Sequence, residues 1–180
     1  MFGKRAGIYA AEYAQRAEFV PVPDTALDST VALLDNARNG TGTEKVAAIR
    51  KDLQDTMDLN VQVFRTADTL QTALDDIAAL EARYANISIQ DKGKRFNLDL
   101  LEAVELGFLL DMAEAMTVAA LHRQESRGGH YREDFPNRDD VNFMRHTMAY
   151  REVGDDGAES IRLDYKPVVQ TRYQPMERKY

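Results

Sequence analysis

Residues 97–125 read NLDLLEAVELGFLLDMAEAMTVAALHRQE and predict the longest helix of the chain, with Asn97 as its N-cap. Apolar residues lie on most sides of this helix: Leu98, Leu101, Leu106, Phe108, Leu109, Met112, Met116, Val118 and Leu121. Because a helix that is apolar nearly all round is buried by several neighbours, we expect it at the centre of an antiparallel bundle of three or four helices.

Helical signals continue on the N-terminal side of this segment. Further helices are predicted over residues 2–18, 24–38, 43–59 and 66–84. Asp24 or Thr25, Thr43 and Thr66 are the residue types that cap the last three of them. The first has no capping residue before it, and Gly3 and Gly7 lie on one face, where small side chains allow another backbone to approach closely. We therefore expect a close neighbour on that face, and a helix whose beginning is missing.

The periodicity changes from helical to alternating after residue 145. Residues 146–153 and 160–165 flank a Gly-Asp-Asp-Gly turn at 154–157, which predicts a two-stranded hairpin. An isolated hairpin is marginally stable, so it must dock on another element. Residues 166–180 predict an extended tail. The fold class is therefore mainly α: an antiparallel three-helix (up-down-up) bundle with extra N-terminal helices, a small C-terminal β-hairpin and an extended tail.

Composition excludes several classes of protein. The net charge of -7 argues against a nucleic-acid partner, because phosphates reward a basic surface. The chain has no cysteine, so disulfides and thiolate metal sites cannot form within it. No apolar run approaches the roughly 20 residues that a membrane span needs, so direct membrane insertion is not expected.

The most densely charged segment follows the long helix: ESRGGHYREDFPNRDD, residues 125–140. Four of its residues can donate to an oxyanion and could clamp a dicarboxylate or phosphate: Arg127, His130, Arg132 and Arg138. In the alternative interpretation the carboxylates of the same segment neutralise these cations and the segment holds an interface together: Glu125, Glu133, Asp134, Asp139 and Asp140.

Other candidate chemistry in the sequence is incomplete. His130 and Asp134 could form a metal-binding or acid–base pair, and Glu102 and Glu105 lie three residues apart on the long helix. Neither pair belongs to a recognised motif, and no P-loop, nucleophile elbow or full dinucleotide fingerprint is present. The residues alone therefore offer no complete catalytic set, and the metal prediction is none.

The charged segment resembles the ESRGAHxREDxPxRDD signature of succinate dehydrogenase and fumarate reductase flavoproteins. One departure is Gly129, where the family usually has alanine. Similar stretches continue along the chain: FGKRAG at 2–7, LQDTMD at 53–58, VFRT at 63–66, NFMRHTMAY at 142–150 and IRLDYKPV at 161–168. The ending YQPMERKY looks most like actinobacterial succinate dehydrogenases.

The resemblance implies the C-terminal portion of such a flavoprotein. The flavin-binding fingerprint, the histidine linked to FAD and the proton-delivering arginine of the family all lie upstream of FGKRAG, so no catalytic residue and no cofactor are expected in this stretch, and FAD belongs to the parent. The implied domains are the tail of the last flavin-domain helix (1–19), a helical bundle (20–126), and a charged loop with hairpin and tail (127–180).

The parent is implied to oxidise succinate to fumarate, with electrons passing through FAD to quinone. Its implied partners are the flavin-binding domain, an iron–sulfur subunit and membrane anchor subunits, and the implied location is the inner face of a bacterial plasma membrane. An interdomain clasp is expected from Arg127, His130, Arg132, Glu133, Asp134 and Arg138. The same domain of fumarate reductase or L-aspartate oxidase, or a free-standing helical interaction module, remains as an alternative.

Overall fold

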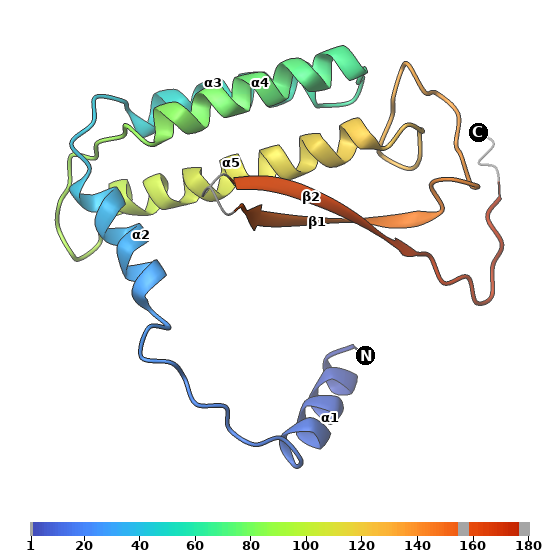
Figure 1. Cartoon of the computed structure of the whole chain (residues 1–180), viewed down its shortest axis with the longest axis horizontal. Helices are drawn as coiled ribbons and strands as arrows, with labels where there is room; N and C mark the ends of the chain where they lie inside the picture. Colours follow the sequence, from blue (N-terminus) through green and yellow to red (C-terminus); the bar gives the residue numbers. More distant parts are fainter. Residues whose placement is uncertain (1, 155–158, 177–180) are drawn as a thin grey trace. The chain divides into compact units, whose positions relative to one another are not determined.

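The computed structural model describes residues 2–154 and 159–176, and the chain divides into two compact units, Met1–Leu33 and Leu34–Tyr180 (Figure 1). The first unit contains α1 (Phe2–Ala14) and the first turns of α2 (Asp28–Asn39). In the described part of the chain nothing lies within 4 Å of a Cβ built on Gly3 or Gly7, so the close neighbour expected on that face stays a prediction.

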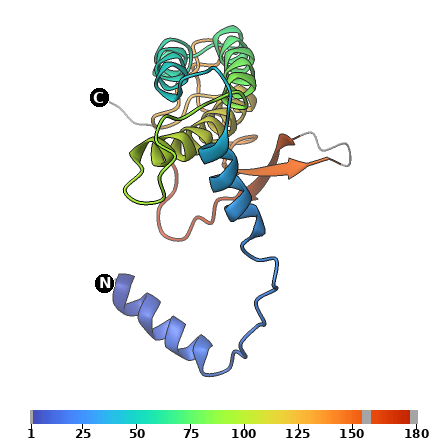
Figure 2. The ribbon, with the colours of Figure 1, turned by 90° about the vertical axis from the view of Figure 1, so that its left-hand side faces the viewer.

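The second unit is built on three helices that run alternately up and down: α3 (Val46–Asn60), α4 (Ala67–Tyr84) and α5 (Leu98–His122). Seen from the side in Figure 2, α3 and α4 lie next to each other over α5. Buried apolar side chains between them include Ile49 and Leu53 of α3, Ile77 of α4, and Leu106 and Leu110 of α5. The predicted mainly helical fold with a three-helix bundle is confirmed.

The capping predictions were right at two helices and wrong at two. The side chains of Asn97 and Thr66 accept hydrogen bonds from the amides of Leu100 and Thr69, as N-caps do. Thr43 caps nothing: the N-cap of α3 is Lys45, and α2 begins at Asp28 instead of at residue 24 or 25.

The late start of α3 has a physical cause. Glu44 pairs in a short parallel bridge, in which its amide donates to the carbonyl of Asn86 and its carbonyl accepts from the amide of Ser88. This extended pairing occupies the backbone groups that a helix starting at Thr43 would use, so the helix begins two residues later than a cap there would allow.

The long helix α5 is buried on one face only, which corrects the expectation of burial on several sides. The buried residues repeat every three or four positions: Ala103, Leu106, Leu110, Ala113, Thr117 and Ala120. On the opposite face Phe108 is 55% and Met112 is 62% exposed, and Leu101 and Met116 are also exposed. Among the described helices none is long and apolar enough to cross a membrane.

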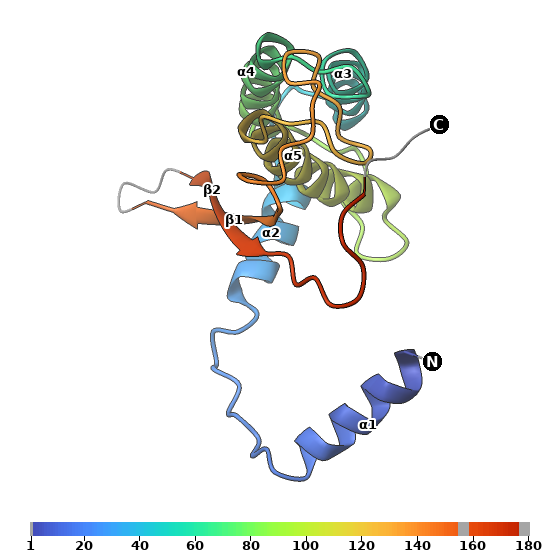
Figure 3. The same cartoon turned by 90° about the vertical axis from the view of Figure 1, so that its right-hand side faces the viewer.

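The hairpin pairs β1 (Arg145–Val153) with β2 (Glu159–Pro167) in an antiparallel register that sets Thr147 opposite Tyr165. It is longer at both ends than predicted, and the predicted turn at 154–157 lies largely outside the described residues. Both strands contact α5, as the marginal stability of a lone hairpin requires (Figure 3). Arg151 of β1 strengthens this contact through an ion pair with Asp111 of α5.

Candidate functional site: the charged loop between α5 and β1

Glu125 is the centre of the charged loop, and its side chain is fully buried. One oxygen accepts from Arg123 at 2.6 Å and from Arg127 at 2.8 Å. The other accepts from Arg127 at 3.0 Å and from the amide of Asp139 at 2.8 Å. Burial alone would raise the pKa of Glu125, but the hydrogen bonds from Arg127, the Asp139 amide and Arg123 outweigh it and hold this pKa below its usual range. Glu125 is therefore a charged hub.

Arg132 is the second buried charge, with a relative exposure of 1%. Its guanidinium donates to the carbonyls of Ala120 and Leu121 at 3.0 and 2.9 Å, in the last turn of α5, where a cation is favourable. Its other nitrogens donate to both oxygens of Asp134, each at 2.7 Å. Asp134 in turn accepts from the amide of Ala67, the first residue of α4, at 2.9 Å.

His130 lies between two arginines and is neutral. Its Nδ1 is 2.8 Å from Nη1 of Arg65, and because a guanidinium can only donate, Nδ1 accepts. The proton is then on Nε2, which donates to the carbonyl of Arg123 at 3.1 Å. Burial and the charges of the nearby arginines lower the pKa of His130, which agrees with the neutral form of its ring.

The outer side of the loop is only partly buried. Asp140 joins Arg127 at 2.6 Å to Arg138 at 2.9 Å, and Arg138 also donates to the carbonyl of Met176 in the tail. The Glu133 amide donates to the carbonyl of Arg65, while its side chain is exposed. Gly128 has a φ of 61°, a conformation that side chains other than glycine rarely adopt, so this glycine permits the turn.

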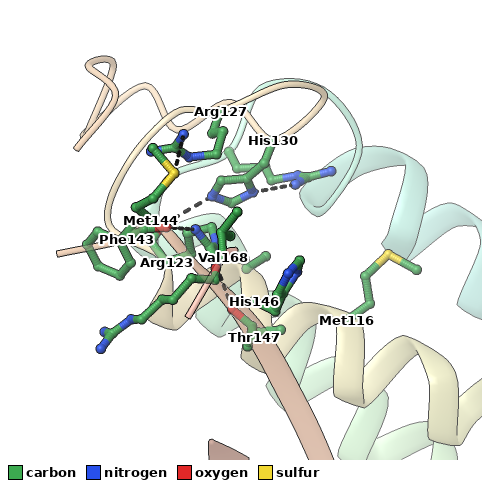
Figure 4. A pocket seen from close by; sticks show the side chains of 13 residues that line it. Met116, Arg123, Arg127, His130, Phe143, Met144, His146, Thr147 and Val168 are labelled. Atoms are coloured by element: carbon green, nitrogen blue, oxygen red, sulfur yellow. Dashed lines mark hydrogen bonds between the residues drawn. The ribbon is translucent and has the colours of Figure 1, made fainter. Parts of the chain in front are cut away.

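A pocket of about 660 Å³ opens where the loop meets the end of α5 and the start of β1 (Figure 4). Arg127, His130 and Met144 lie on one side of it, and His146 and Met116 lie on the other. Arg123 also lines the pocket and ties the elements together, because it donates to the carbonyls of Phe143 and Arg145 and to the hydroxyl of Thr147.

The structure separates the four side chains of the predicted oxyanion clamp. Arg127 and His130 line the pocket, whereas Arg132 is buried in the bundle and Arg138 faces the tail. The predicted His130–Asp134 pair does not form, because Asp134 is held by Arg132 and His130 by Arg65. Among the described residues no group of three or more His, Asp or Glu side chains could hold a metal ion.

The other predicted carboxylate pair lies elsewhere on the bundle. Glu102 and Glu105 are exposed on α5, where Arg50 of α3 donates to the carbonyl of Glu102 and lies 3.9 Å from the carboxylate of Glu105. This arrangement is an ordinary contact between helices. Lys51 lines the same surface pocket, but it pairs with Asp55 of its own helix.

Among the pocket residues that sequence reasoning missed are the three arginines outside the charged segment: Arg65, Arg123 and Arg145. Arg123 had a local signal, because it alternates with Glu125 and Arg127. Arg65 had none, since it reaches the loop only through the packing of the α3–α4 connection against residues 130–133.

The residues present do not fit a dinucleotide. Such a ligand needs a strand, a glycine-rich turn and a following helix whose N-terminus faces the phosphates. Here Gly128 and Gly129 come after a helix, and the sheet among the described residues is a single antiparallel hairpin. Fold and loop together define a helical domain braced by buried ion pairs, with an open pocket beside the charged loop that arginines line.

Comparison with known proteins identifies the family. A family model described as "Fumarate reductase flavoprotein C-term" matches residues 50–180. The chain belongs to this family, the C-terminal domain of succinate dehydrogenase and fumarate reductase flavoprotein subunits.

Relatives carry both names. The fumarate reductase flavoprotein subunit of Mycobacterium tuberculosis is 39% identical over 187 residues, which cover 100% of this chain and 31% of that protein. The succinate dehydrogenase flavoprotein subunit of Rickettsia bellii is 39% identical over 172 residues, which cover 95% of this chain and 28% of that protein. The chain thus spans about a third of the length of the relatives it matches.

Solved structures agree in fold. A variant of E. coli quinol fumarate reductase FrdA superimposes with a TM-score of 0.84 at 36% identity, covering 98% of this chain and 30% of that one. The Mycobacterium smegmatis Sdh1 complex gives 0.82 at 29% identity, covering 96% and 29%. The likeness inferred from the ending to actinobacterial succinate dehydrogenases in particular is not supported, because fumarate reductases are at least as similar.

Proposed function

We propose that the chain is the C-terminal, structural portion of an FAD-dependent flavoprotein that oxidises succinate to fumarate and passes electrons to an iron–sulfur subunit and on to quinone. The observation that carries this proposal is the continuous match: 100% of the chain aligns with 31% of one relative, and 95% of it aligns with 28% of another. The flavin chemistry is assigned to the remaining part, because the described residues of this chain offer no dinucleotide site.

The direction of the parent reaction is the less supported part of the proposal. Relatives named fumarate reductase and succinate dehydrogenase reach the same 39% identity, so the reverse reaction, fumarate reduction, is an equally close candidate. L-aspartate oxidase is a more distant alternative, on resemblance alone. Steady-state rates of the full-length protein with succinate plus a quinone analogue, and with fumarate plus a reduced viologen, decide between the two directions.

The proposed task of this portion is to brace the flavin-binding domain. The exposed apolar face of α5, which includes Phe108, Met112 and Met116, supports this task, because a stable surface rarely leaves such a stripe uncovered. We further propose that the clasp acts in two layers. Arg132 and Asp134 fix the loop to the bundle, and Arg127, Glu133 and Arg138 present its outer side to the parent, with His130 between the layers.

Arg127→Ala in the full-length holoenzyme tests the bracing role. Removing Arg127 takes two hydrogen bonds from the buried Glu125 and one from Asp140, so we expect lower flavin content and weaker subunit assembly, with the KM for succinate changed less than twofold. Arg95→Ala, in an exposed loop, is the matched control and should change neither the flavin content nor the subunit assembly. Full flavin content with a large rise in KM would refute the bracing role.

The alternative from a different class is a free-standing helical interaction module without a redox role. The mass of the native protein separates the two, because the relatives are about three times longer than this chain. A native mass near 20.4 kDa would favour the free-standing module, and a threefold larger mass with bound flavin would favour the flavoprotein.

A further inference from the structure

The pocket beside the charged loop is lined by cations and by apolar groups. Four arginines and two histidines line it, and one of the histidines, His130, is neutral: Arg65, Arg123, Arg127, Arg145, His130 and His146. Among the residues that the structure describes, no carboxylate belongs to its lining, although the chain as a whole carries a net charge of -7. The pocket therefore concentrates positive charge on an acidic protein.

Glu125 neutralises Arg123 and Arg127, but Arg145 has no such partner among the described residues. The hairpin carries two other arginines, and both have carboxylate partners: Arg151 pairs with Asp111 and Glu159, and Arg162 pairs with Glu152. Arg145 has no carboxylate partner among the described residues, and its buried Nε makes no hydrogen bond there. Its guanidinium instead lies 3.6 Å from the ring centre of Tyr165 and 5.3 Å from that of Phe143.

Arg65, which also lines the pocket, likewise has no carboxylate partner among the described residues. Its Nε donates to the carbonyls of Val61 and Gln62 and its Nη1 to His130, all of them neutral acceptors. Two arginines without a carboxylate partner among the described residues thus line one pocket. Stacking holds Arg145 in place and local hydrogen bonds hold Arg65. Binding of an anion therefore costs little further side-chain conformational entropy.

The apolar part of the lining determines which anion fits. Met116, Ala119 and Phe143 form a wall beside the cations. Such a wall excludes water, which strengthens charge-assisted hydrogen bonds, and it suits a hydrocarbon stem next to a planar oxyanion. A phosphate ion has no stem, whereas a carboxylate on an aliphatic chain satisfies both parts of the pocket.

We propose that this pocket binds a carboxylate group on a short aliphatic stem, held by Arg145 and Arg65. The group comes either from a glutamate side chain of a docked protein segment or from a free organic acid. The site is independent of the direction of the parent reaction. Arg127 and His130 of the clamp that the sequence predicted line this pocket, but Arg132 and Arg138 do not, and the proposed binding groups are Arg145 and Arg65.

The test is a titration of the complete chain followed by the NMR signals of its amides and arginine Nε–H groups. The free-acid probe is glutarate, with uncharged glutaramide as its control, and the protein-segment probe is N-acetyl-glutamyl-methylamide, with the glutamine analogue as its control. We expect saturable shifts at Arg145 and His146 with at least one of the two acids, at a Kd on the order of 1 mM, and none with the neutral analogues. The acid that binds more tightly identifies the source.

Variants assign the site. Arg145→Gln should weaken binding at least tenfold, and Arg145→Lys, which keeps the charge and the stem but not the planar fork, should weaken it about threefold. Arg162→Gln, on the same hairpin but outside the pocket, is the matched control and should bind as the unmodified chain does. If Arg145→Gln lowers the melting temperature, the Kd of Arg145→Lys alone is compared with that of the unmodified chain. Binding that is unchanged in both Arg145 variants, equal binding of inorganic phosphate, or no binding of either acid would overturn the proposal.

Discussion

Arg132 and Asp134 face each other through two parallel hydrogen bonds of 2.7 Å, and together they join the end of α5 to the start of α4. Arg132 binds the last carbonyls of α5 and Asp134 binds the first amide of α4. A cation at a helix C-terminus and an anion at a helix N-terminus each stabilise the helix. One ion pair therefore satisfies the ends of two helices and fixes how they meet.

Acid should weaken this junction in a defined range. The hydrogen bonds from Arg132 lower the pKa of Asp134 from 3.8 to about 2. Since the folded pKa lies below the unfolded one, the stability contributed by Asp134 is complete above about pH 4 and is lost as the pH falls toward 2. Urea unfolding at several pH values measures the difference in the free energy of unfolding between the unmodified chain and Asp134→Asn. This difference should shrink as the pH falls from about 4 toward 2. A difference that is constant from pH 5 to pH 2 would contradict this assignment.

Glu125→Gln should be among the most destabilising single changes in the loop. The carboxylate is fully buried and accepts from two arginines and one amide, so its neutral replacement leaves Arg123 and Arg127 without their shared counter-charge. Breaking a buried pair in this way costs about 3–5 kcal/mol. Equilibrium unfolding in urea measures the loss.

The control for Glu125→Gln is Glu102→Gln, the same exchange at an exposed position of α5. It should change the free energy of unfolding by less than about 0.5 kcal/mol. Similar losses in the two variants would mean that Glu125 does not carry the ion pairs described for it.

Glu114→Gln should stabilise the chain at neutral pH. Burial, followed by the nearby charges of Asp111 and Glu159, raises the pKa of Glu114 against the opposing effect of Arg151. Because the folded pKa lies above the unfolded one, the charged form opposes folding once the pH exceeds the folded pKa. We expect the variant to melt about 1–2 °C higher at pH 7, and the difference to vanish below about pH 4. A lower melting temperature at pH 7 would contradict this reading.

Gly107→Ala tests the contact between α4 and α5. Alanine is the better helix former by about 1 kcal/mol, but its Cβ would lie 2.7 Å from the hydroxyl of Tyr84, which donates to the carbonyl of Ala103. Overpacking costs about 1–3 kcal/mol, so the net change should be destabilising. The Tyr84→Phe variant lacks the hydroxyl that the new Cβ would meet. In that background Gly107→Ala should lower the free energy of unfolding by at least about 1 kcal/mol less than it does in the unmodified chain. Additive effects in this double-mutant cycle would mean that the two residues do not interact.

The helices of the bundle could be predicted because their signals are local. Asn97 and Thr66 are caps that act within one turn, and the apolar residues of α3, α4 and α5 recur at helical spacing. The extent of burial of α5 could not be predicted this way. Its sequence is apolar on both faces, and only the packing of α3 and α4 determines that Leu106 is buried and Met112 is exposed.

The charged loop was recognised from its composition, and the interpretation that its own carboxylates neutralise its arginines is confirmed for Arg127, Arg132 and Arg138. The partner of His130 was not predicted. A cation in sequence can pair with any carboxylate that folding brings near, so His130 was assigned to Asp134 although Arg65, far away in sequence, is its partner. The burial of Arg132 was also unpredictable from its charge, because charged side chains are rarely buried unless they are paired. These facts depend on three-dimensional contacts alone.

The contacts of Glu125 have a further consequence in a chain that has no cysteine. By binding Arg123 before it and the amide of Asp139 after it, this carboxylate closes the segment from 125 to 139 into a ring, as a disulfide between those positions would. Such a ring persists under reducing conditions, where disulfides are lost. Protonation of the Glu125 carboxylate breaks these ion pairs, so low pH should open the ring. Changes in redox potential should leave it closed.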